Sequence, residues 1–99
     1  MIAFGSINKY KITMSGKFKR DVKLAKKRGC DMELIGTVVH NLANDIPLAP
    51  KYRDHQLGGS LSRFRECHIT PDWLLIYEKT SSILILYLYA TGTHSDILE

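Results

Sequence analysis

Three strand-like segments separated by tight turns occupy the last third of the chain and restrict its possible folds more than any other feature. The segments are Arg63–Thr70, Trp73–Lys79 and Ile83–Thr91, and the connections between them are Pro71-Asp72 and Thr80-Ser81-Ser82. Connections this short join antiparallel neighbours. The last two segments are apolar on both faces, which is typical of central, covered strands. We therefore predict an antiparallel meander with helices packed against it.

Alternation along these segments predicts which side chains share a face of the sheet. In the first segment one face carries Phe64, Glu66 and His68, and the other carries Arg65, Cys67 and Ile69. In the last segment one face carries Leu84, Leu86, Leu88 and Ala90, and the other carries Ile85, Tyr87 and Tyr89. The polar residues Glu66 and His68 are thus expected side by side on one face.

Two amphipathic helices are predicted before the meander. The first begins after a Ser15 cap and ends at Gly29, and its apolar face holds Phe18, Val22 and Ala25. The second covers residues 31–44 behind an Asp31 cap, and its apolar face holds Met32, Ile35, Val39, Leu42 and Ala43. The short Gly29-Cys30 link between them predicts an antiparallel helical hairpin.

A short strand at Tyr10–Met14 completes the predicted elements. The order strand-helix-helix-strand-strand-strand predicts an α+β fold in which the helical hairpin packs on a mainly antiparallel, four-stranded sheet. The 99 residues are enough for one domain with one modest core, so we predict a single domain over 1–99. Residues 1–9 show no clear pattern and are interpreted as a loose N-terminal extension.

The segment Asp45–Ser62 is predicted to be a long loop, because it holds two prolines and the pair Gly58-Gly59. Loops of this length in a small domain are often functional. The loop also carries a basic, aromatic and imidazole cluster suited to nucleic acid, made of Lys51, Tyr52, Arg53, Asp54 and His55. A surface loop of mixed polarity is the alternative interpretation.

Charge favours an anionic partner. Lysine and arginine number 14 against 10 aspartates and glutamates, which gives a net charge of +4. Part of the excess forms a stripe on the first helix, made of Lys19, Arg20, Lys23, Lys26 and Lys27. We predict that this stripe, with Lys51 and Arg53, contacts RNA phosphates, and a merely solvated helix face is the alternative.

Other features predict a cytoplasmic protein without a membrane segment. Residues 1–9 lack the apolar core of a signal peptide. The longest apolar run, Ile83–Ala90, is shorter than the roughly 20 residues that span a bilayer. Cys30 and Cys67 form neither a zinc pattern nor a disulfide framework, and they are interpreted as reduced thiols.

The meander predicts where the polar residues gather. His68 lies near the end of one strand, Asp72 lies in the next turn and His94 follows the last strand, so all three are expected at one end of the sheet, with Glu66 beside His68. His55 lies in the loop and is the least constrained. Histidines beside carboxylates can divide acid and base roles, which suits metal-free cleavage of RNA through its 2′-hydroxyl. A metal site and a purely structural turn are the alternatives.

Four segments together resemble the RelE/ParE toxin superfamily, specifically its YafQ-like branch of ribosome-dependent mRNA interferases. The segments are Asp21–Arg28, Asp54–Gly59, Arg65–Tyr77 and Thr91–His94. The resemblance implies a microbial RNase-like fold and cleavage of mRNA in the ribosomal decoding site, with no cofactor and no bound metal. It also implies a cognate antitoxin of the RelB/DinJ kind with an acidic neutralising segment, and contact with operator DNA only through the toxin–antitoxin complex.

The same resemblance implies the site residues. His55, His68, Asp72 and His94 match active-site positions of the branch, and Glu66 stands where an aspartate is usual. His94 is the expected centre of proton transfer, as acid or base. Arg65 is left out of the site because it alternates to the face opposite Glu66. The tail after His94 lacks an aromatic residue that the branch often carries there.

Two other function classes remain open from sequence. A ParE-like toxin would bind a protein target such as gyrase without catalysis, but those members lack the histidine set found here at positions 55, 68 and 94. A plain nucleic-acid-binding module would use the basic stripe alone. Replacing His94 discriminates between these classes, because only an enzyme loses its function while it keeps its fold and binding.

Overall fold

The computed structural model of the chain describes residues 4–5 and 7–97. The predicted N-terminal extension and the C-terminal tail therefore lie partly outside the described residues. Within the extension, Phe4 packs against the main core and Lys9 pairs with Asp45 at 2.5 Å. Asn8 accepts a hydrogen bond of 2.9 Å from the side chain of Asn44. The described part of this segment is thus attached to the body of the protein.

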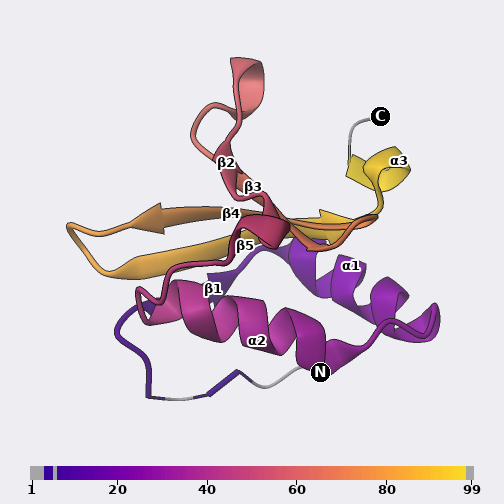
Figure 1. Ribbon diagram of the computed structural model, residues 1–99, viewed down its shortest axis with the longest axis horizontal. Coiled ribbons are helices and arrows are strands. Elements are labelled where there is room, and N and C mark those ends of the chain that lie inside the picture. The colour runs from indigo at the N-terminus through magenta and orange to yellow at the C-terminus, as the bar shows by residue number, and fades with distance from the viewer. Residues whose placement is uncertain (1–3, 6, 98–99) are drawn as a thin grey trace.

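One five-stranded sheet, in the order β1-β5-β4-β3-β2, forms the centre of the fold. It comprises β1 (Lys11–Met14), β2 (His55–Gln56), β3 (Arg65–Thr70), β4 (Trp73–Thr80) and β5 (Ile85–Gly92). The strands β3, β4 and β5 pair antiparallel, which confirms the predicted meander, and β1 pairs parallel with β5. β1 is therefore the edge strand beside β5, and Figure 1 shows the helices on one side of the meander.

The predicted count of four strands was wrong, because β2 lies inside the segment predicted as a loop. Its two residues pair with Arg65 and Glu66 of β3. Two residues are too few to show alternation, so no sequence pattern reveals this strand. Two short 3-10 helices, η1 (Pro50–Tyr52) and η2 (Gly59–Leu61), flank it.

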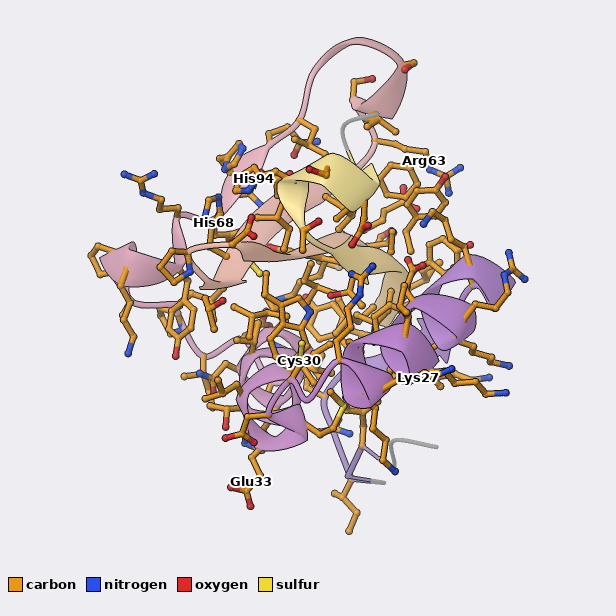
Figure 2. All side chains as sticks on the ribbon, turned by 90° about the vertical axis from the view of Figure 1, so that its right-hand side faces the viewer. Lys27, Cys30, Glu33, Arg63, His68 and His94 are labelled. Carbon is orange, nitrogen blue, oxygen red and sulfur yellow. The ribbon has the colours of Figure 1, made fainter. Side chains whose placement is uncertain are left out.

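The helices α1 (Gly16–Lys27) and α2 (Met32–Ala43) cover one face of the sheet (Figures 1 and 2). Both predicted caps are confirmed: Ser15 accepts a bond from the Phe18 amide, and Asp31 accepts one from the Glu33 amide. Gly29 adopts a left-handed φ of 86° just after the first helix, which permits the turn toward α2.

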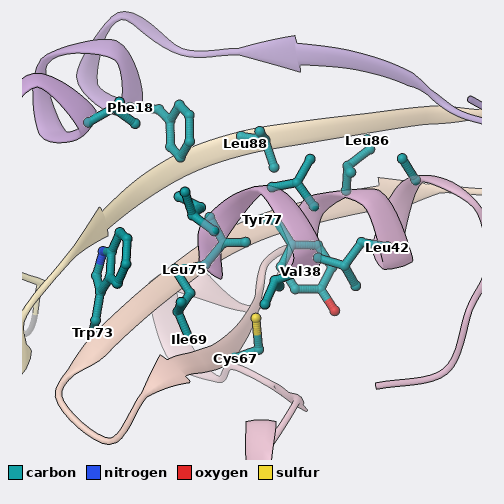
Figure 3. Close-up of a cluster of buried hydrophobic side chains, with 14 of the residues drawn as sticks. Phe18, Val38, Leu42, Cys67, Ile69, Trp73, Leu75, Tyr77, Leu86 and Leu88 are labelled. Atoms are coloured by element: carbon teal, nitrogen blue, oxygen red, sulfur yellow. The ribbon is translucent and has the colours of Figure 1, made fainter. Parts of the chain in front are cut away.

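The main core lies between these helices and the sheet (Figure 3). Phe18 of α1 and Val38 of α2 face Leu75 and Leu88, and all four side chains are at most 1% exposed. Burying side chains of this size contributes roughly 1.5–3 kcal/mol each before conformational entropy is subtracted. None of the described helices is long and apolar enough to cross a membrane.

The opposite face of the sheet carries a smaller apolar cluster built on Phe64, Ile76 and Ala90. Ala90 was predicted to share a face with Leu86 and Leu88, and this prediction was wrong. A register shift against Ile76 and Tyr77 inserts an extra residue into β5 and turns Ala90 to the other side. Leu84 was also misplaced, because it takes a left-handed φ of 54° before β5 begins and is 42% exposed.

Candidate active site

Side chains from four places meet near the end of the sheet that holds the β3–β4 turn, and Glu66 and His68 of β3 lie on the face opposite the helices. His55 comes from β2, Glu66 and His68 from β3, Asp72 from the β3–β4 turn, and His94 from the first position of α3 (His94–Ile97). Figure 2 shows His68 and His94 close together beside α3. The structure therefore brings all five predicted site residues into one region, including His55.

His94 and Asp72 form an exposed pair within this group. The Nδ1 atom of His94 lies 2.9 Å from Oδ1 of Asp72, and the two side chains are 46% and 72% exposed. An ionised carboxylate only accepts hydrogen bonds, so Nδ1 of His94 carries the proton and donates it. The bond from His94 lowers the pKa of Asp72, which keeps this carboxylate ionised at neutral pH. Nε2 of a neutral His94 is then left with a free lone pair.

His68 lies next to His94. Their ring centroids are 5.6 Å apart with planes at 71°, an edge-on arrangement. His68 is also linked to Glu66, because its Nε2 is 3.8 Å from Oε1 of that carboxylate. The two imidazoles thus stand close enough to act on neighbouring atoms of one substrate.

Glu66 is the buried member of the group. It is 6% exposed, and its Oε1 atom faces Nε2 of His55 at 3.5 Å and Nε2 of His68 at 3.8 Å. Its second oxygen has no hydrogen-bond partner within the described part of the chain. A buried carboxylate is costly unless it is paired, and the two imidazoles are the groups placed to pair with it.

Strand pairing, rather than a free loop, positions His55. His55 stands directly opposite Glu66 in the β2–β3 register. Its Nδ1 atom lies 2.7 Å from the carbonyl oxygen of Arg53, which can only accept, so Nδ1 carries a proton. Arg53 itself has a left-handed φ of 49°, which turns its carbonyl toward the ring. Both ring nitrogens of His55 thus face oxygen atoms, Nδ1 that of the Arg53 carbonyl and Nε2 that of the Glu66 carboxylate.

A partly buried network of side chains holds the segment that carries His55. The Tyr77 hydroxyl donates to Oδ1 of Asp54 at 2.6 Å, and Arg65 approaches Oδ2 of Asp54 at 3.3 Å. Burial, followed by the adjacent Asp54 carboxylate, raises the pKa of Tyr77. Arg65 lies on the helix-facing side of β3, away from Glu66, as predicted. Its function here is to hold Asp54.

The predicted RNA-binding residues are all exposed but lie in different places. The members of the α1 stripe project into solvent, and Figure 2 shows Lys27 on a different part of the surface from His68 and His94. Lys51 lies over the Tyr52 ring at 5.2 Å, within η1. The structure therefore separates the α1 stripe from the histidine group, while Lys51 and Arg53 sit near the segment that carries His55.

Sequence reasoning missed the polar residues that support His94. Asp96 accepts a bond of 2.9 Å from the Thr93 amide and pairs at 2.9 Å with Arg28, the C-cap residue of α1. Asp21 of α1 accepts a bond of 3.1 Å from the Thr91 amide. The spacing Thr93-x-x-Asp96 is that of a capping box, which was the available signal for a helical turn at this position.

The geometry bears on the two alternatives to catalysis by this group, which are a metal site and a purely structural turn. Among residues 4–5 and 7–97, no three His, Cys, Asp or Glu side chains are placed to hold a metal ion. Cys67 is buried on the helix-facing side, and burial raises the pKa of its thiol, which argues against a nucleophile. The polar residues extend over β2, β3 and α3, more than a hairpin turn requires.

Comparison with known proteins decides the family. Residues 10–99 match the model of the family described as "Bacterial toxin of type II toxin-antitoxin system, YafQ". The chain belongs to the YafQ toxin family. The mRNA interferase toxin YafQ of Escherichia coli (strain K12) is 42% identical over 85 residues, which cover 85% of this chain and 90% of that relative. The predicted family and the predicted class of enzyme, an mRNA interferase, are thereby confirmed.

Solved structures of YafQ-like proteins confirm the fold class. YafQ in the E. coli DinJ-YafQ toxin-antitoxin complex matches with a TM-score of 0.84 at 39% identity, covering 92% of this chain and 99% of that one. A metal-bound toxin from Helicobacter pylori matches with a TM-score of 0.83 at 46% identity, covering 89% of this chain and 98% of that one. The first relative was solved with an antitoxin, and the second with a metal.

Proposed function

We propose that this YafQ-family mRNA interferase cleaves ribosome-bound mRNA by metal-independent acid–base chemistry centred on His94. The observation that carries the proposal is the bond of 2.9 Å between His94 Nδ1 and Asp72. It fixes the tautomer of the ring and leaves Nε2 as a base at an exposed position. A histidine oriented by a carboxylate is suited to take a proton near neutral pH.

In the proposed reaction, Nε2 of His94 removes the proton of an RNA 2′-hydroxyl. The 2′-oxygen then attacks the adjacent phosphorus, and the bond from phosphorus to the 5′-oxygen breaks. A protonated imidazole of His55 or His68, both beside the Glu66 carboxylate, gives a proton to the leaving 5′-oxygen. The cationic rings also stabilise the charge that develops on the phosphate. The products are a 2′,3′-cyclic phosphate and a 5′-hydroxyl.

The proposal extends to location and partners. A ribosomal target places the protein in the cytoplasm, and we assign the exposed basic stripe on α1 to ribosomal RNA. By analogy with the DinJ-YafQ complex, a cognate antitoxin with an acidic segment neutralises the toxin, and operator DNA is contacted only through that complex. The whole chain acts as one toxin domain.

The test is primer extension on an mRNA translated in vitro, with and without ribosomes. Replacing His94 by alanine removes a general base, so cleavage is expected to fall by about 10²–10⁴-fold. The matched control is His40→Ala, because His40 is an exposed histidine on α2 away from the site. Cuts that survive in His94→Ala would move the catalytic role to another histidine. Growth arrest without cuts would refute the nuclease proposal and favour a protein target.

A second arm of the same assay tests metal independence, because a relative was solved with a bound metal. The ribosome itself needs Mg²⁺, so the toxin alone is treated with a transition-metal chelator and then desalted before addition. Unchanged cleavage is the expected result. Loss of cleavage that returns with added Cu²⁺, Zn²⁺ or Ni²⁺ would contradict the metal-independent mechanism.

A further inference from the structure

The element that carries His94 is too short to hold itself in place. The helix α3 has four residues, and none of them is buried. A single helical turn is unstable in water without outside contacts. A cavity of about 490 Å³ lies between α1 and the segment that precedes α3, with Leu24, Trp73 and Thr93 among its lining residues. Apolar packing therefore provides little support for this segment on the side facing α1.

Polar contacts with Asp96 replace that packing. The Asp96 carboxylate accepts the Thr93 amide at 2.9 Å, and the Thr93 hydroxyl accepts the Asp96 amide at 3.2 Å. These reciprocal bonds form a capping box that starts the turn at His94. The same Oδ2 atom of Asp96 receives the guanidinium of Arg28 at 2.9 Å. One carboxylate thus both starts α3 and ties it to α1.

The backbone before α3 is adapted to this carboxylate. A Cβ atom at Gly92 would lie 2.9 Å from both Cβ and Oδ2 of Asp96, closer than real contacts allow. Only glycine lets Asp96 fold back over the end of β5. One residue earlier, the Thr91 amide donates to Asp21 of α1 at 3.1 Å. The segment that joins β5 to α3 is therefore attached to α1 at two points, by the bond from Thr91 to Asp21 and by the pair of Asp96 with Arg28.

We infer that Arg28 and Asp96 are positioning residues that orient His94 toward Asp72 by tying α3 to α1. The inference rests on the proposed role of His94 in proton transfer. Neither residue touches the reacting atoms in this assignment. Arg28 is the C-cap residue of the helix that carries the basic stripe, but its partner gives it a different function from the lysines of that stripe.

The ion pair between Arg28 and Asp96 is partly exposed to solvent, which favours a positioning role over a stabilising one. The side chains of Arg28 and Asp96 are 47% and 32% exposed, and exposed pairs add little to global stability. Small displacements of a catalytic group, by contrast, cost large factors in rate. Loss of this pair should therefore reduce cleavage while the unfolding midpoint stays almost constant.

The experiment compares Arg28→Gln, Asp96→Asn and Arg28→Lys in the ribosome-dependent cleavage assay under single turnover. We expect the first two to lower the cleavage rate constant by about tenfold or more, since misplacement by about 1 Å costs on the order of 10²-fold. Arg28→Lys keeps the charge and should restore part of the rate. Asp96→Asn keeps a side-chain acceptor for the Thr93 amide, so the turn itself persists.

The Asp96→Asn variant also distinguishes a positioning role of Arg28 from direct binding of RNA by Arg28. If Arg28 acted only through an RNA phosphate, Arg28→Gln would raise the ribosome concentration needed for half-maximal cleavage, and Asp96→Asn would not lower the rate. The matched control is Arg63→Gln, which breaks an exposed pair of similar length with Glu78 at 2.8 Å on another part of the sheet. The positioning role is refuted if Arg28→Gln behaves like Arg63→Gln.

A second readout does not depend on cleavage. The ¹⁵N chemical shifts of the His94 ring nitrogens should give the NMR signal of the Nδ1-protonated tautomer that Asp72 holds. In Arg28→Gln and Asp96→Asn this signal should broaden or be lost, while it persists in Arg63→Gln. An unchanged signal in both variants overturns the inference even if His94 proves not to be catalytic. If the signal is lost in both variants but His94→Ala still cleaves mRNA, only the proposed function is refuted, and the positioning inference stands.

Discussion

The hydrogen bond between Tyr77 and Asp54 gives a sharp prediction about the segment that carries His55. Tyr77 is 1% exposed, and its hydroxyl donates to an Asp54 oxygen at 2.6 Å. Tyr77→Phe removes this bond and keeps the ring in the core. Hydrogen bonds to charged groups contribute roughly 1.5–3 kcal/mol. The Asp54 side chain is 26% exposed, so water replaces part of the lost partner.

We expect Tyr77→Phe to lower the free energy of unfolding by about 1–2 kcal/mol, near the lower end of that range. For a domain of this size the thermal midpoint should fall by about 4–8 °C per kcal/mol. Because Asp54 directly precedes β2, the loss should also loosen His55 and lower cleavage at a temperature where the variant remains folded. Urea denaturation with a constant m-value measures the first effect, and single-turnover cleavage measures the second.

The control for this variant is Tyr87→Phe. Tyr87 is a half-buried tyrosine of the same sheet, and its hydroxyl makes no hydrogen bond in the described ranges 4–5 and 7–97. The raised pKa of Tyr77 adds a pH test. Because folding raises the pKa of Tyr77, the stability that its neutral hydroxyl provides is present below the ordinary tyrosine pKa of about 10. This stability is lost as the pH rises above that value. If Tyr77→Phe is as stable as Tyr87→Phe at neutral pH, the reasoning is wrong.

Two further predictions concern other parts of the fold. Ser15→Ala removes the cap that accepts the Phe18 amide at 2.8 Å, and it should lower the free energy of unfolding in urea by about 1–2 kcal/mol; an unchanged midpoint would contradict the cap. Lys79 and Lys9 hold the pKa of Asp45 at about 2. Because this pKa is lowered by folding, its stabilising effect is present above the ordinary value of 3.8 and is lost as pH falls toward 2. Asp45→Asn should therefore lower the thermal midpoint at pH 7 and flatten its fall between pH 4 and pH 2.

Several features of the fold could be predicted from the sequence because each depends on neighbours along the chain. The Ser15 and Asp31 caps are local hydrogen bonds within three residues. The meander follows from two short turns, and turns this short leave only an antiparallel arrangement. The same topology places His68, Asp72 and His94 at one end of the sheet, so most of the candidate site was predictable before any coordinates.

Other features depend on contacts between residues far apart in sequence, and these only the tertiary structure decided. The strand at His55 exists because β3 offers a free edge, and two residues show no alternation of their own. The bulge that moves Ala90 to the second face depends on the register between β4 and β5, which a single-strand pattern does not contain.

The residues that support the site were hidden for the same reason. The attachment of α3 to α1 joins Arg28 to Asp96 across 68 positions, and the support of β2 joins Asp54 to Tyr77 across 23. The order of residues along the chain was enough to predict the set of chemical groups and the end of the sheet where they meet. The tertiary structure decided how firmly each group is held, because that depends on polar partners brought together only by folding.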